Sequence, residues 1–433
     1  MRRLGPALAE RDYRLWWLAF MGMGMSLQML EVAIGWEVYG QHRSALDLGW
    51  IGLAEFVPMF VLALPAGQLA DRLPRRLLLA GSLLMGTAVG IGLAVVSASG
   101  DTSVLPYLAL AVGAGMSMAL GTPAARAMPP TLVGPELLGS AMTLRSIAGQ
   151  SGNVIGPALG GLLYGTSPSL VYLLAGGVCL LAAGCALAMR PTAPPDAAIA
   201  ADAVSLAGER SPAAAGLDGV LEGLRFVRHT EILLGAILLD LLAVLFGGAV
   251  ALLPIFARSI LHVGATGLGV LRAAHALGAL VGAAAITRRP IGRHAGRLLL
   301  VVVALYGASI VVFGLSRTFV VSLIALGVSG FVDLYSMNIR STTVALASPD
   351  RLRGRVNAVE MVFISASNEL GAFESGLAAF LVGTIPAVVG GGAITILIAL
   401  SWRRLFPALA DVDRLEAVRP VVPVAASATT MSN

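Results

Sequence analysis

The sequence contains no lysine, only two cysteines and few charged residues, and each scarcity excludes a class of protein. Charged residues make up 12% of the 433 positions, whereas soluble globular chains carry about 25%, so a string of soluble domains is excluded. The net charge of +5 comes from arginine alone, and no basic patch interleaved with aromatic side chains indicates a nucleic-acid partner. Cys179 and Cys185 lie on different faces of one apolar helical segment, so neither a disulfide nor a metal pair is expected.

The sequence also has none of the usual arrangements of catalytic or cofactor-binding residues. No phosphate-cradling G-x-x-x-x-G-K-[ST] loop occurs, which argues against ATP as an energy source supplied by this chain. The five histidines are scattered, and no metal-ligand or nucleophile constellation is visible. We therefore expect a protein that is not an enzyme and that needs no cofactor or metal.

What the sequence has in abundance is apolar residues, at 57% of positions. Windows of about 20 apolar residues, long enough to cross a bilayer, recur about twelve times. They predict an all-α integral membrane protein with twelve transmembrane helices. The predicted spans are Tyr13–Tyr39, Leu48–Ala70, Leu77–Val96, Val104–Ala127, Leu138–Tyr164, Leu170–Met189, Ile232–Phe256, Thr266–Ile286, Gly296–Leu315, Phe319–Ala347, Val356–Val382 and Ile385–Leu405.

Arginines in the predicted loops alternate from one side of the membrane to the other. Loops on the side of the N-terminus carry nearly all of them, and the other side carries only Arg43, Arg258 and Arg317. Because positive charge is retained on the cytoplasmic side, both termini are predicted to be cytoplasmic. The expected location is a bacterial cytoplasmic (inner) membrane, crossed several times.

The two halves of the sequence are copies of each other. A shift of about 214–215 residues superimposes Arg126 on Arg340, Asn153 on Asn368 and Gly161 on Gly376. Two parallel repeats predict two pseudo-symmetric six-helix bundles that rock about a central cavity. The expected units are residues 1–190 (first bundle), 191–230 (cytoplasmic linker with an amphipathic helix), 231–410 (second bundle) and 411–433 (disordered tail), in a monomer embedded in lipid.

A charged loop between the second and third predicted spans carries a family resemblance. It reads Gly67-Gln68-Leu69-Ala70-Asp71-Arg72-Leu73-Pro74-Arg75-Arg76. It resembles the major facilitator superfamily signature G-x-x-x-D-R-x-G-R-R and departs from it at Pro74, where glycine is usual. The resemblance covers essentially residues 10–410.

Other segments are similar to particular branches of that superfamily. Residues 152–161 resemble the second half of the fifth-helix motif of drug/proton antiporters, but Thr143 stands where a first glycine would be. Residues 252–256, 352–359 and 367–376 look like the enterobactin-exporter branch. The resemblance therefore implies the major facilitator fold and a siderophore or drug exporter.

The resemblance implies that the charged loop is a gating latch. Asp71 would face the start of helix 11 near Arg355, with Arg126 as a second partner, when the cavity opens outward. The copy of Asp71 in the second half is Ile286, so the latch would be asymmetric. The alternative is that the loop only fixes topology. The predicted latch residues are Gly67, Asp71, Arg72, Arg75, Arg76, Arg126 and Arg340.

Ionisable residues within predicted spans are candidates for proton or substrate binding, because such groups are costly in hydrocarbon. The resemblance places helices 1, 4, 7 and 10 around the cavity, which favours Glu31, Asp240 and Asp333. Arg145 and Glu360 are repeat-related and opposite in sign, which makes them candidates to pair across the halves. A structural ion pair is the alternative for each residue.

The fifth predicted span contains a glycine–proline motif made of Gly156, Pro157, Gly160 and Gly161. Proline removes a backbone donor and bends a helix, and the two later glycines allow a close neighbour. The motif either shapes a cavity wall or only serves packing.

Together these patterns predict a secondary active transporter that exports small amphipathic molecules, siderophore or drug-like, by alternating access coupled to protons. The alternatives are an importer or a transporter of another substrate in the same superfamily, and a sensor or scaffold of this fold that transports nothing. Intramembrane carboxylates argue against the scaffold.

Overall fold

The computed structural model describes residues 5–190 and 216–420, with side chains except at positions 63–64, 67–68, 70–72, 216–218 and 220. Residues 191–215 of the predicted linker (191–230) and residues 421–433 of the predicted tail (411–433) lie outside the described residues. The described parts are helical throughout and contain no strand. The first half consists of α1 (Arg11–His42), α2 (Ala45–Arg72), α3 (Arg75–Ser99), α4 (Leu105–Ala127), the short α5 (Pro129–Leu132), α6 (Leu138–Tyr164) and α7 (Pro168–Ala188).

The second half begins with α9 (Gly216–His229), an amphipathic helix whose buried Val227 faces the bundle while Leu221 and Arg225 are exposed. It packs against α15. The remaining helices are α10 (Glu231–Gly247), α11 (Leu253–Ile255), α12 (Gly264–Arg288), α13 (Ala295–Leu315), α14 (Phe319–Ala347), α15 (Asp350–Val382), α16 (Thr384–Leu405) and α17 (Pro407–Ala410).

Ten helical segments of the described chain are long and apolar enough to cross a membrane. Two further helices, α6 with 27 residues and α15 with 33, have sufficient length but are more polar. They occupy repeat-related positions in the two halves, which is consistent with twelve crossings.

The seventh predicted span is interrupted in the structure. α10 ends at Gly247, and the chain continues through a 3-10 turn (Ala249–Leu252), α11 and a π-helical turn (Phe256–Ile260). A Cβ at Gly247 would lie 2.6 Å from a ring carbon of Tyr306, so a larger residue there would displace that ring. Glycine favours the helix weakly, and Pro254 removes a backbone donor shortly after it. Both residues favour a break in the apolar window.

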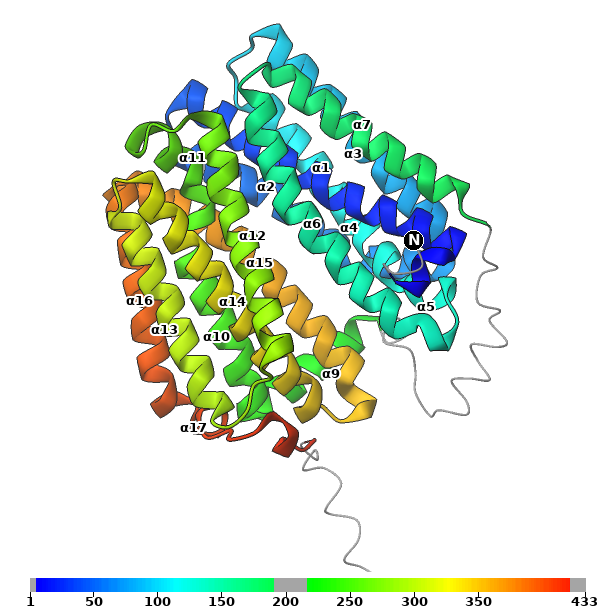
Figure 1. Ribbon diagram of the computed structural model, residues 1–433, viewed down its shortest axis with the longest axis vertical. Helices are drawn as coiled ribbons and strands as arrows, with labels where there is room; N and C mark the ends of the chain where they lie inside the picture. Colours follow the sequence, from blue (N-terminus) through cyan, green and yellow to red (C-terminus); the bar gives the residue numbers. More distant parts are fainter. Residues whose placement is uncertain (1–4, 191–215, 421–433) are drawn as a thin grey trace, which may run out of the picture.

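Helix packing follows the same pattern in both halves (Figure 1). In the first half α1 packs on α6 and α7, α2 on α4, and α3 on α4 and α7. The equivalent pairs in the second half are α10 with α15 and α16, α12 with α14, and α13 with α14 and α16. The bundles meet through two equivalent pairs, α6 with α12 and α2 with α15.

The hydrophobic cores show where the bundles are joined. We call the end with loops 73–74, 128–137, 289–294 and 348–349 the arginine-rich end, and the opposite end the far end. At the far end one cluster unites Val32 and Tyr39 of α1 with Phe256 and Phe313 of the second half. At the arginine-rich end each bundle has its own cluster. The helices of the two bundles accordingly diverge toward that end (Figure 1).

Candidate functional site

The two polar helices, α6 and α15, carry stripes of polar side chains between the bundles, and we call these stripes together the polar route. Thr143, Ser146, Gln150 and Asn153 recur every three or four residues along α6, and three of them are exposed. On α15 the exposed Asn368 is the repeat-related copy of Asn153. Because α6 and α15 each contact the other bundle, the stripes lie where the bundles face each other. Polar residues at membrane depth belong at such protein-lined or water-filled places.

An ion pair bridges the two bundles toward the far end. Glu31 of α1 accepts a charge-assisted hydrogen bond from Arg272 of α12, and both side chains are about one-fifth exposed. Arg272 is eight residues from the start of α12, or about 12 Å along the helix. Nearby, Tyr39 and Ser259 share a hydrogen bond of 2.9 Å, and the Arg258 guanidinium lies 4.9 Å from the Trp36 ring. These contacts join the bundles only when the far end is closed.

We expect Glu31→Gln to weaken this closure, because the Arg272 guanidinium would lose its counter-ion in a partly buried place. The loss is roughly 1–3 kcal/mol, between the values for exposed and buried pairs. Transport and the thermal unfolding midpoint of the purified protein are the measurements. The exchanged pair, Glu31→Arg with Arg272→Glu, should recover part of both. A swapped protein no better than either single variant would show that the pairing is not what matters.

A second ion pair is buried within the second bundle. Asp240 of α10 and Arg340 of α14 lie 2.6 Å apart, with 10% and 7% of their side chains exposed. The Nε of Arg340 has no hydrogen-bond partner among the described residues. Arg340, predicted as a latch residue, is therefore paired with a carboxylate of its own bundle in this structure. Asp240 is the partner that sequence spacing alone did not assign to it.

Asp333, the third predicted carboxylate, lies near a histidine of a neighbouring helix. The imidazole of His275 on α12 is 4.0 Å from the Asp333 carboxylate of α14 and 3.0 Å from the Ser329 hydroxyl. The helices cross closely here, since a Cβ at Gly330 would overlap the His275 carbonyl oxygen. Sequence spacing placed Arg272 and His275 on one helix face but could not identify partners on other helices.

The predicted latch is only partly visible. The backbone of α2 is described here, but the side chains of Asp71 and Arg72 and the surroundings of Gly67 are not, so the contact of Asp71 stays a prediction. The last two arginines of the loop serve their own bundle. Arg75 donates to the carbonyl oxygen of Ala127 at 3.0 Å, and Arg76 donates to that of Met189 at 2.8 Å.

The remaining predicted charges lie in the halves of α4, α6 and α15 that are nearer the arginine-rich end. Arg126 of α4 contacts the Met361 sulfur of α15 at 3.2 Å, across the two bundles. Within the described residues, Arg145 and Glu360 form no ion pair with each other or with another residue. Their pairing across the halves stays a prediction for a conformation closed at this end.

The glycine–proline motif of α6 makes contacts on two sides. A Cβ at Gly156 would lie 2.7 Å from the Met25 carbonyl oxygen of α1, and one at Gly160 would lie 3.1 Å from that of Met29. A Cβ at Gly161 would overlap the Ala265 carbonyl oxygen of α12. Pro157 lies inside the helix, and Gly269 of α12 packs on its carbonyl oxygen. The motif thus holds α6 against α1 and against the other bundle.

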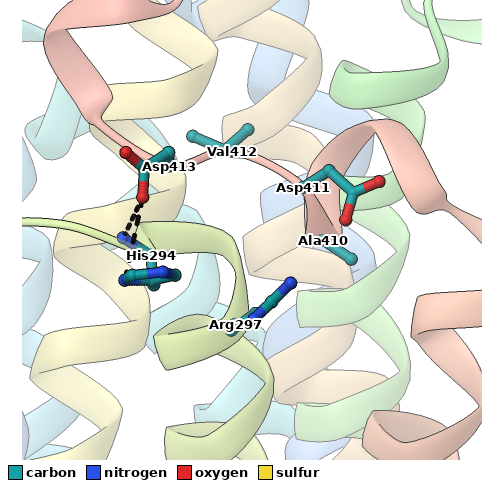
Figure 2. A pocket seen from close by; sticks show the side chains of 6 residues that line it. All are labelled: His294, Arg297, Ala410, Asp411, Val412 and Asp413. Atoms are coloured by element: carbon teal, nitrogen blue, oxygen red, sulfur yellow. Dashed lines mark hydrogen bonds and ion pairs between the residues drawn. The ribbon is translucent and has the colours of Figure 1, made fainter.

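A small pocket of about 170 Å³ lies away from this polar route, at the arginine-rich end (Figure 2). There the chain after α17 folds over the start of α13. The Asp413 carboxylate accepts from the backbone N–H of His294 at 3.0 Å, and Arg293 lies 3.4 Å from it. The His294 N–H lowers the pKa of Asp413 below its usual range, with a further contribution from Arg293. Asp413 therefore caps the start of α13 as an anion.

Replacing Asp413 with asparagine should loosen this cap at neutral pH. Because its folded pKa is lowered, the carboxylate stabilises the fold above its unfolded pKa of about 3.9, and this contribution is lost as the pH falls through the folded value. We expect faster tryptic cleavage at Arg414 and Arg419 in the variant. The matched control is Asp411→Asn, which changes another carboxylate of the same pocket. Equal cleavage of the two variants would contradict the cap.

The geometry agrees with a comparison against known families. The family model described as Major Facilitator Superfamily matches residues 16–372, which is most of the chain. The chain belongs to the major facilitator superfamily. The membrane helices, the two bundles and the polar route between them are thus those of a transporter superfamily.

Members of this superfamily with curated names include proteins similar to this chain along most of its length. An enterobactin exporter, EntS, of Citrobacter koseri is 28% identical over 382 residues, covering 86% of each chain. An enterobactin exporter, EntS, of Escherichia coli O81 is 27% identical over 396 residues, covering 88% of this chain and 90% of that protein.

Solved structures of the superfamily share the fold at low sequence identity. A D-xylose–proton symporter aligns with a TM-score of 0.71 at 12% identity, covering 92% of this chain and 98% of that one. A bacterial homologue of the human lysosomal transporter Spinster, in an inward-facing and occupied conformation, aligns with a TM-score of 0.67 at 14% identity, covering 92% and 97%.

Proposed function

We propose that this chain is a secondary active exporter of small amphipathic molecules that works by alternating access and is driven by protons. The observation that carries the proposal is the distribution of the hydrophobic cores. One core joins the bundles at the far end, whereas each bundle has its own core at the arginine-rich end. Two rigid bundles that are joined at one end can rock relative to each other, so that one end opens as the other closes.

The arginine distribution assigns the sides of the membrane in this proposal. Loops rich in arginine stay in the cytoplasm, which places the arginine-rich end and both termini there. The conformation is then open toward the cytoplasm, the side from which an exporter loads its substrate. The protein would act as a monomer in a bacterial cytoplasmic membrane.

Protons are the proposed energy source because titratable groups lie within the membrane helices, both at the bundle interface and inside the second bundle. Glu31 bridges the bundles through Arg272, and Asp333 lies beside His275. Opening of the far end separates Glu31 from Arg272, and an unpaired carboxylate within the membrane binds a proton more readily. Protonation would thus be linked to the change of conformation.

The names of the EntS relatives support a siderophore-like substrate, and the drug-like alternative rests on the resemblance of residues 152–161. The test is an accumulation assay over siderophores and drugs, in a bacterial strain that lacks its own exporters. With active export, cells that make the protein should retain less substrate than cells that make Asp333→Asn, and a protonophore should abolish the difference. Retention unchanged by the protonophore would exclude proton coupling. Higher retention in cells with the unaltered protein would identify an importer instead.

A further inference from the structure

Three aromatic side chains of α1 fix the backbone beside two arginines of other helices. Trp16 donates its indole N–H to the carbonyl oxygen of Ala125 at 3.0 Å, one residue before Arg126 on α4. Trp17 donates to that of Leu144 at 2.8 Å, one residue before Arg145 on α6. The Tyr13 hydroxyl donates to Ala141 one turn earlier in α6. Such anchoring holds both arginines at defined places between helices.

The two arginines follow backbone groups that are held by the same segment of α1, and neither guanidinium group has a counter-ion among the described side chains. Among the described side chains, no carboxylate oxygen lies within 4.0 Å of either group. The one polar contact of Arg126 to a described side chain is the Met361 sulfur of the other bundle, which is a weak acceptor. Both cations thus have unused hydrogen-bond donors, and Arg126 lies at the bundle interface.

The internal repeat shows that this lack of a counter-ion is particular to the first half. The copy of Arg126 in the second half is Arg340, and the buried Asp240 neutralises it. The same shift of 214–215 residues places Met25 or Ser26 where Asp240 stands. The hydroxyl of Ser26 already donates to the carbonyl oxygen of Ala175. The first half has therefore kept the cation and has no acid in the equivalent place.

From this geometry we propose that Arg126 and Arg145 bind an anionic group, a carboxylate or a phenolate, of the transported molecule. The proposal rests on the transport function proposed above and names the substrate class. A guanidinium presents a rigid pair of donors that matches a carboxylate. The contact of Arg126 with α15 places the group between the bundles, where the ligand would reach it from the arginine-rich end. Met361 adds an apolar surface for the rest of an amphipathic molecule.

Binding to the purified full-length protein in neutral detergent tests the proposal without requiring transport. The probes are radiolabelled salicylate, a planar ring with a carboxylate, and salicylamide, its neutral counterpart. We expect Arg126→Gln and Arg145→Gln to weaken salicylate binding about tenfold or more, as expected for a lost charge-assisted hydrogen bond. Salicylamide binding should stay within about twofold. Arg126→Lys should retain part of the salicylate affinity, and Arg317→Gln at the far end is the matched control for loss of one positive charge.

Four outcomes would count against the proposal, and a fifth separates it from the proposed function. Absence of saturable salicylate binding by the unaltered protein would overturn it. Equal losses of salicylate and salicylamide affinity in the arginine variants would also overturn it. Such losses would indicate a structural role, which a lowered unfolding midpoint would also reveal. If phosphatidylglycerol displaced salicylate, and bound tightly only when both arginines were present, the anion bound at this site would be a lipid headgroup. Salicylate binding that appears only in Asp71→Asn, and that Arg126→Gln or Arg145→Gln then abolishes, would identify Asp71 as the real partner of the arginines. A protein that binds salicylate through these arginines but shows no proton-driven efflux would refute the proposed function and leave this site standing.

Discussion

Replacing Arg340 with methionine is expected to lower the free energy of unfolding by about 3–5 kcal/mol, because it leaves the Asp240 carboxylate buried without a counter-ion. The two groups lie 2.6 Å apart and are almost completely covered. Asp240→Asn should be similarly costly, since it leaves the guanidinium unpaired. The midpoint of thermal unfolding in detergent, followed by tryptophan fluorescence, measures both effects.

The double variant Asp240→Leu with Arg340→Met distinguishes a structural role from a functional one. Replacing both members of a buried pair by apolar residues is often neutral, so the double variant should unfold close to the unaltered protein. If it also transports, the pair is structural. If it is stable but inactive, Asp240 or Arg340 takes part in transport. An unfolding midpoint as low as that of the single variants would show that the pair itself is not the source of stability.

Gly161→Val is expected to force the bundles apart at the far end, because a Cβ there would overlap the Ala265 carbonyl oxygen of α12. Backbone cannot move aside as a flexible side chain does, so the close contact between α6 and α12 should be lost. We expect transport to fall at least tenfold. A cysteine introduced at Ser259, whose hydroxyl contacts Tyr39 in the closed far end, should react faster with a membrane-impermeant maleimide.

The control for this substitution lies on the same helix. A Cβ at Gly139 would have no neighbouring atom within 4 Å, so Gly139→Val should leave transport and labelling unchanged. Gly376→Val, at the repeat-related contact with Ala45 of α2, should reproduce the effect of Gly161→Val. Unchanged labelling in both interface variants would mean that these glycines do not hold the far end closed.

The helical architecture was accessible from the sequence because membrane crossing leaves a local signature. A run of about 20 apolar residues can only be a helix, since every backbone polar group must be satisfied within the segment. The repeat gave the two bundles, and arginine alternation gave an expected orientation. The break after Gly247 was missed because the apolar window continues through it.

The sequence identified the important charged residues but not the residues with which they pair. Glu31, Asp240 and Asp333 could be singled out because ionisable groups are rare at membrane depth. Their partners, Arg272, Arg340 and His275, lie on other helices. Arg75 and Arg76 resembled latch residues by position, but they donate to carbonyl groups of their own bundle.

By itself the sequence determined the class of the molecule, the number of long apolar segments and the duplication, because these depend on composition and on residues compared along one chain. Only the tertiary structure decided which charges are neutralised and which end of the bundles is closed. Ion pairs such as Glu31 with Arg272 and the core shared by Tyr39 and Phe256 join residues more than 200 positions apart. Such contacts depend on how rigid helices pack, and no spacing along the chain encodes that directly.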